Sequence, residues 1–155
     1  MKNIRRPAKY EETFRLLSER SQQHGNRPIF VTQRDLLCFC AILGVHVGAR
    51  SKLSGESQEL DGRVFDSHGP SLDIVYLIAL TESRDATILA SEHEDEMVAI
   101  FEEYAATGLQ TLNEWIAQTP ADIYGVDAIL NGLVKHGFLK SSTVSVEKVI
   151  QDVTF

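Results

Sequence analysis

The feature that most constrains the fold is a long segment, residues 93–118, in which apolar side chains keep the spacing of an α-helix. Side chains three or four residues apart lie on one face of a helix, and the segment repeats that spacing at Met97, Phe101, Tyr104, Leu112 and Trp115. Carboxylates at positions 94–96 fall in the first turn, where they stabilise the positive end of the helix dipole. We therefore predict one helix over this segment, weakened by about 1 kcal/mol at Gly108 if that glycine lies in its interior.

A second segment, residues 35–47, is apolar on nearly all sides, which is typical of a helix inside a core. Thr32 stands three residues before Asp35, and this spacing resembles a helix-capping pair. Gly44 and Gly48 permit either close packing or a left-handed helix end. The pattern therefore predicts a central helix.

Shorter amphipathic segments predict helices nearer the two ends. Pro7 is suited to a helix start, and the segment after it, which ends at residues 24–25, has one apolar stripe at Tyr10, Phe14 and Leu17. Near the other end, a segment that closes at residues 136–137 has its apolar positions at Ile123, Val126, Leu130 and Leu133. We expect these stripes to face the core.

The remaining segments allow more than one structure. Residues 53–70 are rich in Ser, Gly and Asp and predict a loop, in which residues 63–65 could form a strand that pairs with residues 29–31. Residues 72–80 fit a buried helix or a buried strand equally well by periodicity, and we prefer the helix because no sheet is evident for a strand to join. The tail after residue 140 fits both a strand and a short helix.

Together the segments predict a mainly α protein: a single compact domain of about five to six helices, with a short two-stranded β element as a possible addition. Its expected parts are a basic helical part (1–52), a loop (53–70), an acidic helical part (71–140) and a tail (141–155). We find no N-terminal signal pattern and no apolar run near the roughly 20 residues that span a bilayer. We therefore expect a cytoplasmic protein.

Charge is divided unevenly along the chain. Residues 1–52 contain ten basic and four acidic residues, a net charge of +6, while the remainder contains five basic and eighteen acidic residues, a net charge of −13. A local positive field of this kind attracts polyanions, and phosphate, as in a nucleic acid, is the obvious attractant. An ordinary solvated surface is the alternative explanation.

Residues typical of catalysis and metal binding do not form familiar motifs in this sequence. A Walker A loop, a dinucleotide-binding Gly-rich loop and a zinc-type Cys/His cluster are all absent from it. Cys38 and Cys40 are interpreted as buried packing residues, because side chains two positions apart diverge on a helix and apolar surroundings raise a thiol's pKa. The five histidines are widely separated and are expected to be exposed to solvent. We therefore predict no catalytic residue, no metal site and no cofactor.

Several short stretches resemble DNA phosphorothioation-associated protein 4, a family of small bacterial proteins. The matching stretches are residues 4–7, 9–11, 14, 34–36, 41–44, 48–50, 101–105 and 108–109. Members of this family are encoded beside systems that place sulfur on the DNA backbone and cut unmarked DNA. The resemblance implies a role in DNA modification, restriction and bacterial defence, and it supplies no active residue to carry over.

Three hypotheses for the function follow. The preferred one is an accessory, non-enzymatic DNA-binding or regulatory protein that contacts phosphates without reading bases, through Arg5, Arg6, Lys9, Arg50 and Lys52. The alternative is an adaptor that does not bind DNA and docks onto a larger restriction or modification subunit through an apolar helix face. The least favoured is a small nuclease or hydrolase that would depend on a carboxylate such as Glu102 or Asp66. The oligomeric state is left open.

Overall fold

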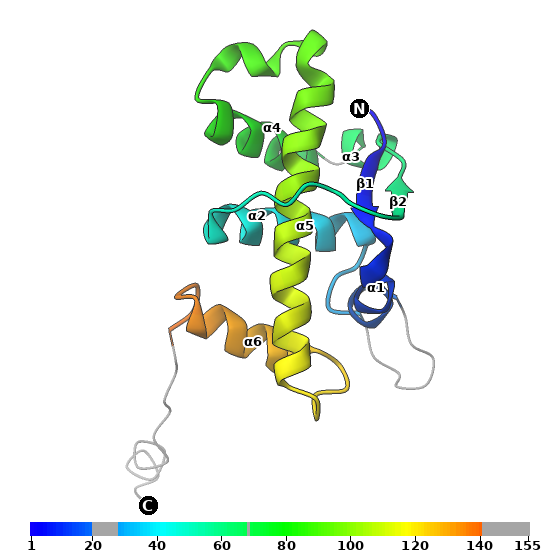
Figure 1. The fold of residues 1–155 in the computed structure, drawn as a ribbon, viewed down its shortest axis with the longest axis vertical. Helices are drawn as coiled ribbons and strands as arrows, with labels where there is room; N and C mark the ends of the chain where they lie inside the picture. Colours follow the sequence, from blue (N-terminus) through cyan, green and yellow to red (C-terminus); the bar gives the residue numbers. More distant parts are fainter. Residues whose placement is uncertain (20–27, 68, 141–155) are drawn as a thin grey trace, which may run out of the picture.

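The computed structural model describes residues 1–19, 28–67 and 69–140, and within them the protein is mainly helical. Figure 1 shows the longest helix, α5 (Glu94–Gln118), running along the length of the molecule with the other elements packed beside it. The other α-helices are α1 (Glu11–Ser18), α2 (Gln33–Val47), α3 (Arg63–Asp66), α4 (Gly69–Ser83) and α6 (Val126–Lys135). Three short 3-10 helices are η1 (Ala8–Tyr10), η2 (Ala86–Leu89) and η3 (Ser91–His93). The mainly α fold class with a small β element is confirmed.

Helix α2 lies across α5 in Figure 1, and the two backbones touch at the crossing. A Cβ atom at Gly44 would lie 2.0 Å from the carbonyl oxygen of Tyr104, and one at Gly108 would lie 1.8 Å from that of Cys40. No side chain fits at either glycine unless the helices move apart, because interiors are close-packed. Gly108 is therefore more than a weak point in α5, since its missing side chain lets the helices meet.

Both ends of α2 match the sequence expectation. Thr32 Oγ1 accepts a hydrogen bond from the backbone N–H of Asp35 at 3.1 Å, which satisfies one of the donors that a helix start leaves unpaired. Gly48 ends the helix in the left-handed conformation, with φ of 76°. The central helix predicted for residues 35–47 is confirmed.

The N-terminal helix begins later than predicted. Pro7 is the last residue of strand β1, and α1 starts at Glu11 after the 3-10 turn η1. The stripe formed by Tyr10, Phe14 and Leu17 is buried, as expected. Residues 24–25, which were expected to end this helix, lie outside the described residues.

The small sheet is formed by other residues than predicted. Strand β1 (Ile4–Pro7) pairs antiparallel with β2 (Ser57–Leu60). The pairing predicted for residues 63–65 with residues 29–31 is wrong, because residues 63–65 belong to the helical turn α3 and bury Phe65. A short apolar run fits a strand or a helical turn, and burial of this aromatic ring is satisfied by the turn.

Helix α4 confirms the helix expected over residues 72–80. Helix α6 is also present, but it buries other side chains than the predicted ones. The buried residues of α6 are Ala128, Ile129 and Gly132, and the exposed ones include Val126 and Leu130. The reason is the small residue at Gly132, where a Cβ atom would lie 2.2 Å from the indole ring of Trp115. The close approach at Gly132 makes the side with Ala128 and Ile129 the inner one and leaves Val126 and Leu130 outside, while Leu133 of the predicted stripe packs at the edge of the core. The tail after residue 140 lies outside the described residues.

Replacing Gly108 with alanine should destabilise the fold because the new methyl group would overlap the backbone of Cys40. We expect the G108A change to lower the free energy of unfolding by about 3 kcal/mol, at the upper end of the range for overpacked cores. Urea denaturation followed by circular dichroism measures this change. Gly69→Ala is the matched control, since nothing lies within 4 Å of its Cβ position. Equal effects of the two substitutions would contradict the packing argument.

Candidate functional site

The predicted phosphate-binding residues begin on β1, where Arg5 contacts Glu102 of α5. Arg5 Nη2 donates to Glu102 Oε2 at 2.8 Å, and the backbone N–H of Arg5 donates to Oε1 at 2.7 Å. The side chain of Glu102 is 1% exposed, so these donors replace the hydrogen bonds that water would give to an exposed carboxylate. The hydrogen bond to Glu102 raises the pKa of Arg5 above its usual value. Arg5 therefore fixes β1 to the middle of α5, and its charge is paired with Glu102 although its side chain is 52% exposed.

Arg6 extends from the opposite face of the strand and is 2% exposed. Its guanidinium lies over the ring of Phe14, with Cζ 3.9 Å from the ring centroid. Nη2 donates to Glu11 at 2.6 Å and to Gln58 at 2.8 Å, whereas Nε and Nη1 have no hydrogen-bond partner among the described residues. Arg6 is therefore buried in this structure, because strand alternation turns its side chain inward.

Arg50 joins the loop after α2 to helices α4 and α5. Its Nη1 donates to Glu82 at 2.7 Å, and its Nε donates to Glu103 at 2.8 Å. Tyr104 Oη also donates to Glu82, at 2.5 Å. The hydrogen bonds from Tyr104 and then from Arg50 hold the pKa of Glu82 below its ordinary value. Arg50 is an internal bridge whose charge is shared by two carboxylates.

Lys9 and Lys52 are exposed, as are Arg5 and Arg50, but the two lysines have no carboxylate partner among the described residues. Lys9 Nζ lies 4.9 Å from the ring centroid of Tyr10. The structure therefore does not gather the five predicted residues into one uncompensated basic surface. DNA contact by any of the five stays a prediction, and these two lysines could make it without breaking an internal ion pair.

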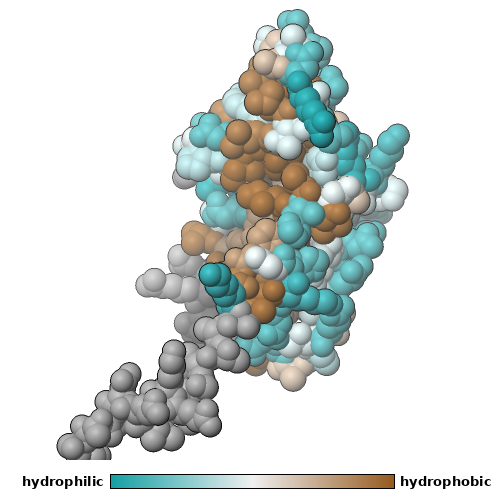
Figure 2. Space-filling model, turned by 90° about the vertical axis from the view of Figure 1, so that its left-hand side faces the viewer, coloured by the Kyte–Doolittle hydropathy of each residue, from teal (hydrophilic) through white to brown (hydrophobic). Residues whose placement is uncertain are grey.

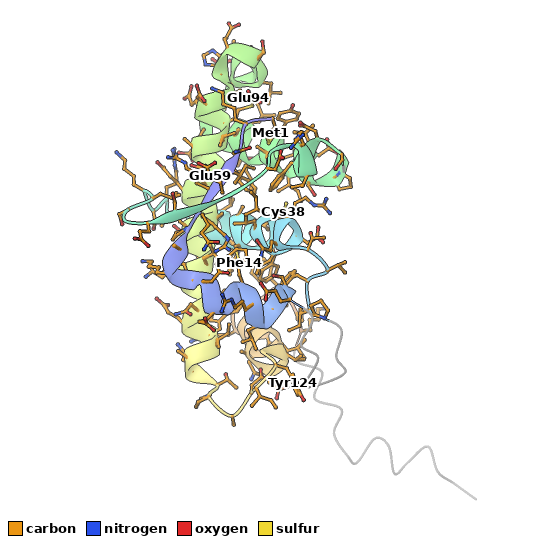
Figure 3. The ribbon with its side chains drawn as sticks, turned by 90° about the vertical axis from the view of Figure 1, so that its right-hand side faces the viewer. Met1, Phe14, Cys38, Glu59, Glu94 and Tyr124 are labelled. Atoms are coloured by element: carbon orange, nitrogen blue, oxygen red, sulfur yellow. The ribbon has the colours of Figure 1, made fainter. Side chains whose placement is uncertain are left out.

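The carboxylate and cysteine side chains considered for enzyme chemistry take part in contacts that hold the fold together. Asp66 accepts a hydrogen bond from the amino group of Met1 at 2.6 Å, and Glu94 lies 3.7 Å from the same group, near Met1 in Figure 3. Burial raises the pKa of the Cys38 thiol to about 11 and also raises that of Cys40.

No three His, Cys, Asp or Glu side chains gather as a metal site within the described ranges. Among these same residues, no helix combines the length and apolar character needed to cross a bilayer.

An apolar surface on α4 and α2 was missed by the sequence reasoning, which treated both segments as buried. Figure 2 shows apolar side chains gathered on one side of the molecule, at the height of α4 and α2 in Figure 1. The exposed apolar residues of these elements and the adjoining η2 are Leu77 (61% exposed), Ile42 (45%), Val47 (42%) and Leu89 (42%). We call these four side chains the apolar face. Its sequence signal was that the segments of α4 and α2 are both apolar on nearly every side, whereas a helix that packs on a core through one side needs apolar residues on that side alone.

These features define a class of protein: a small helical protein in which Arg5, Arg6 and Arg50 bind carboxylates of the same chain, with an apolar face left uncovered by the described residues. The chain matches the family model of DNA sulphur modification system-associated protein 4 over residues 3–149, and it belongs to that family. This membership confirms the resemblance seen in the short sequence matches. No curated protein and no solved structure was found to match the chain.

The structural role of Arg5 can be tested by removing its charge while keeping its length. Arg5→Met leaves the buried Glu102 without its guanidinium partner, and we expect the free energy of unfolding to fall by about 3 kcal/mol. Arg15→Met removes a guanidinium that is 57% exposed, and should cost no more than about 1 kcal/mol. Urea denaturation of both variants measures the difference. A loss at Arg5 no larger than that at Arg15 would show that the contact with Glu102 is not important for stability.

The lowered pKa of Glu82 predicts a pH dependence of stability. Because the folded value is depressed, the stabilisation is complete above the ordinary pKa of an unfolded glutamate and is lost as the pH falls through the lowered folded value. We expect Glu82→Gln to be less stable than the native chain at neutral pH, with the difference shrinking as the solution becomes acidic. Thermal melts from neutral to acidic pH measure this trend. A difference that stays constant over this range would rule out the assignment.

Proposed function

We propose that this chain is an accessory protein of a DNA sulphur modification system that docks onto a larger protein subunit of that system and performs no catalysis itself. Family membership supports the association with the system. The observation that carries the adaptor role is the apolar face on α4 and α2. This is the second of the three functions considered from the sequence.

The apolar face fits a protein partner because it is more than a set of scattered apolar side chains. Single exposed leucines are normal on soluble proteins, whereas a gathered apolar surface marks an interaction site. Helix α4 buries Val75, Ile78 and Ala79, yet presents Leu77 on its other side with 61% of its surface exposed. Burying a leucine of this kind stabilises a complex by about 1.5–3 kcal/mol.

Contact with DNA phosphates is the weaker alternative for the same chain. Arg5 and Arg50 would have to leave Glu102, Glu82 and Glu103 to bind phosphate, and these carboxylates would then repel the DNA. The exposed Lys9 and Lys52 could still make a salt-sensitive contact. Two lysines on an acidic protein support a stable DNA complex less well than the apolar face supports a protein complex.

The proposal predicts direct binding to a protein subunit without DNA. The tagged chain is mixed with each subunit of the sulphur modification system, expressed one at a time and treated with nuclease. We expect one subunit to be retained, and Leu77→Asp to weaken its binding at least about tenfold because the charge cannot be buried in the interface. Biolayer interferometry measures the affinities.

The matched control is Val31→Asp, because Val31 is 80% exposed and lies before α2, outside the apolar face. This variant should bind like the native chain. Circular dichroism checks that both variants remain folded. Binding that disappears after nuclease treatment, or that Leu77→Asp leaves unchanged, would contradict the proposed docking.

A further inference from the structure

Arg84, the residue that follows α4, has a backbone conformation that an arginine rarely adopts. Its φ angle is 55°, in the left-handed region, where the Cβ atom of an L-residue crowds the following carbonyl group. The other residues with positive φ in the described part of the chain are all glycines, at positions 48, 55, 125 and 137. Glycine adopts this conformation without that crowding. The arginine therefore costs stability that a glycine would not, which points to a role for its side chain.

The two carboxylates next to Arg84 along the chain are already bonded to other groups. Glu82 accepts hydrogen bonds from the hydroxyl of Tyr104 at 2.5 Å and from Arg50 at 2.7 Å. Asp85 caps η2, where it accepts a hydrogen bond from a backbone N–H at 2.9 Å. Arg84 itself is exposed and forms no ion pair within the portion of the chain that the structure describes. Its positive charge is therefore available to a group outside this molecule.

Arg84 lies between two elements that contribute to the apolar face. It follows α4, which carries Leu77, and precedes η2, which carries Leu89. The backbone N–H of Arg84 still donates to the carbonyl oxygen of Leu80 at 2.9 Å, so its Cα continues the helical path and stands two turns after Leu77 on the same side of α4. Figure 2 shows hydrophilic side chains at the margin of the apolar surface. A positive charge is thus held at the edge of the surface proposed for docking.

We propose that Arg84 binds a carboxylate of the partner subunit when an apolar segment of that subunit covers the apolar face. This inference rests on the proposed function and adds the chemistry of the partner: apolar side chains with an aspartate or a glutamate at their edge. Protein interfaces have an apolar centre and a polar rim, and charges in the rim select the partner and speed association. A guanidinium suits this task because its fork of N–H donors matches the two oxygens of a carboxylate.

Three substitutions separate the charge of Arg84 from its backbone conformation. Arg84→Gln removes the charge and keeps the strained conformation, Arg84→Gly removes both, and Arg84→Lys keeps the charge. The binding probe is the subunit that the native chain retains after nuclease treatment. We expect the Gln and Gly variants to bind it about fivefold more weakly, with slower association that depends less on salt, and the Lys variant to bind within about twofold of the native chain. Biolayer interferometry at low and moderate salt measures these rates.

Thermal melts of the same variants test the cost of the left-handed conformation. Arg84→Gly should melt about 2 °C above the native chain because glycine relieves the crowding, whereas Arg84→Gln should melt at about the native temperature. Damage to the fold does not raise stability while it lowers affinity, so the Gly variant distinguishes docking from a structural role. Arg15→Gln is the matched control, since it removes a guanidinium that is 57% exposed on α1, outside the apolar face, and should bind like the native chain.

Native binding by Arg84→Gln and Arg84→Gly, while Leu77→Asp still binds weakly, would overturn this inference and leave the proposed function standing. Native binding by all three variants, or no subunit retained at all, would overturn both. Lower melting temperatures for both the Gln and Gly variants would show that the arginine stabilises the fold, for example through the helix dipole, and would count against the docking role. Binding that disappears with nuclease would assign the charge to DNA phosphate instead of a carboxylate.

Discussion

The rest of the structure depends on the backbone contact between α2 and α5. At Gly44 and Gly108 each helix presents its bare backbone to the other, so the two axes approach more closely than side chains would permit. That approach buries Cys40 and Ala41 in the middle of the molecule. Helices α1, α4 and α6 then pack against a pair whose separation is already fixed.

Most of the described basic side chains in the N-terminal part form ion pairs with carboxylates of the same molecule. Arg5 and Arg50 each bind carboxylates on α5, and Arg6 stacks on Phe14 beneath the sheet. Strand β1 buries Ile4 in the core, and the bonds of Arg5 and Arg6 add polar attachments to α5 and α1. The division of charge along the sequence thus reflects, in large part, ion pairs that join distant segments.

The helices could be predicted from the sequence because their signals are local. The periodicity of residues 93–118 and the cap at Thr32 depend on neighbours within a few positions, and both were read correctly. The small sheet could not be predicted, since its two strands are separated by about fifty residues and one of them, residues 57–60, is largely polar.

The partners of the arginines could not be predicted from the sequence either. Arg5 finds Glu102 at a separation of 97 positions, which no spacing rule anticipates. Burial of Arg6 could have been suspected if residues 4–7 had been recognised as a strand, because alternation places it on the same side as the apolar Ile4. The apolar face was missed because composition shows that a helix is apolar and does not show how many of its sides find neighbours.

The length of α5 has a consequence for how the molecule responds to a binding event. Its 25 residues are packed by α4 and η2 on the first half and by α6 on the second. Fraying at one end of a helix breaks only the hydrogen bonds of the nearby turns. A contact that steadies one end of α5 therefore slows hydrogen exchange at that end first, and each half of the helix reports on what binds beside it.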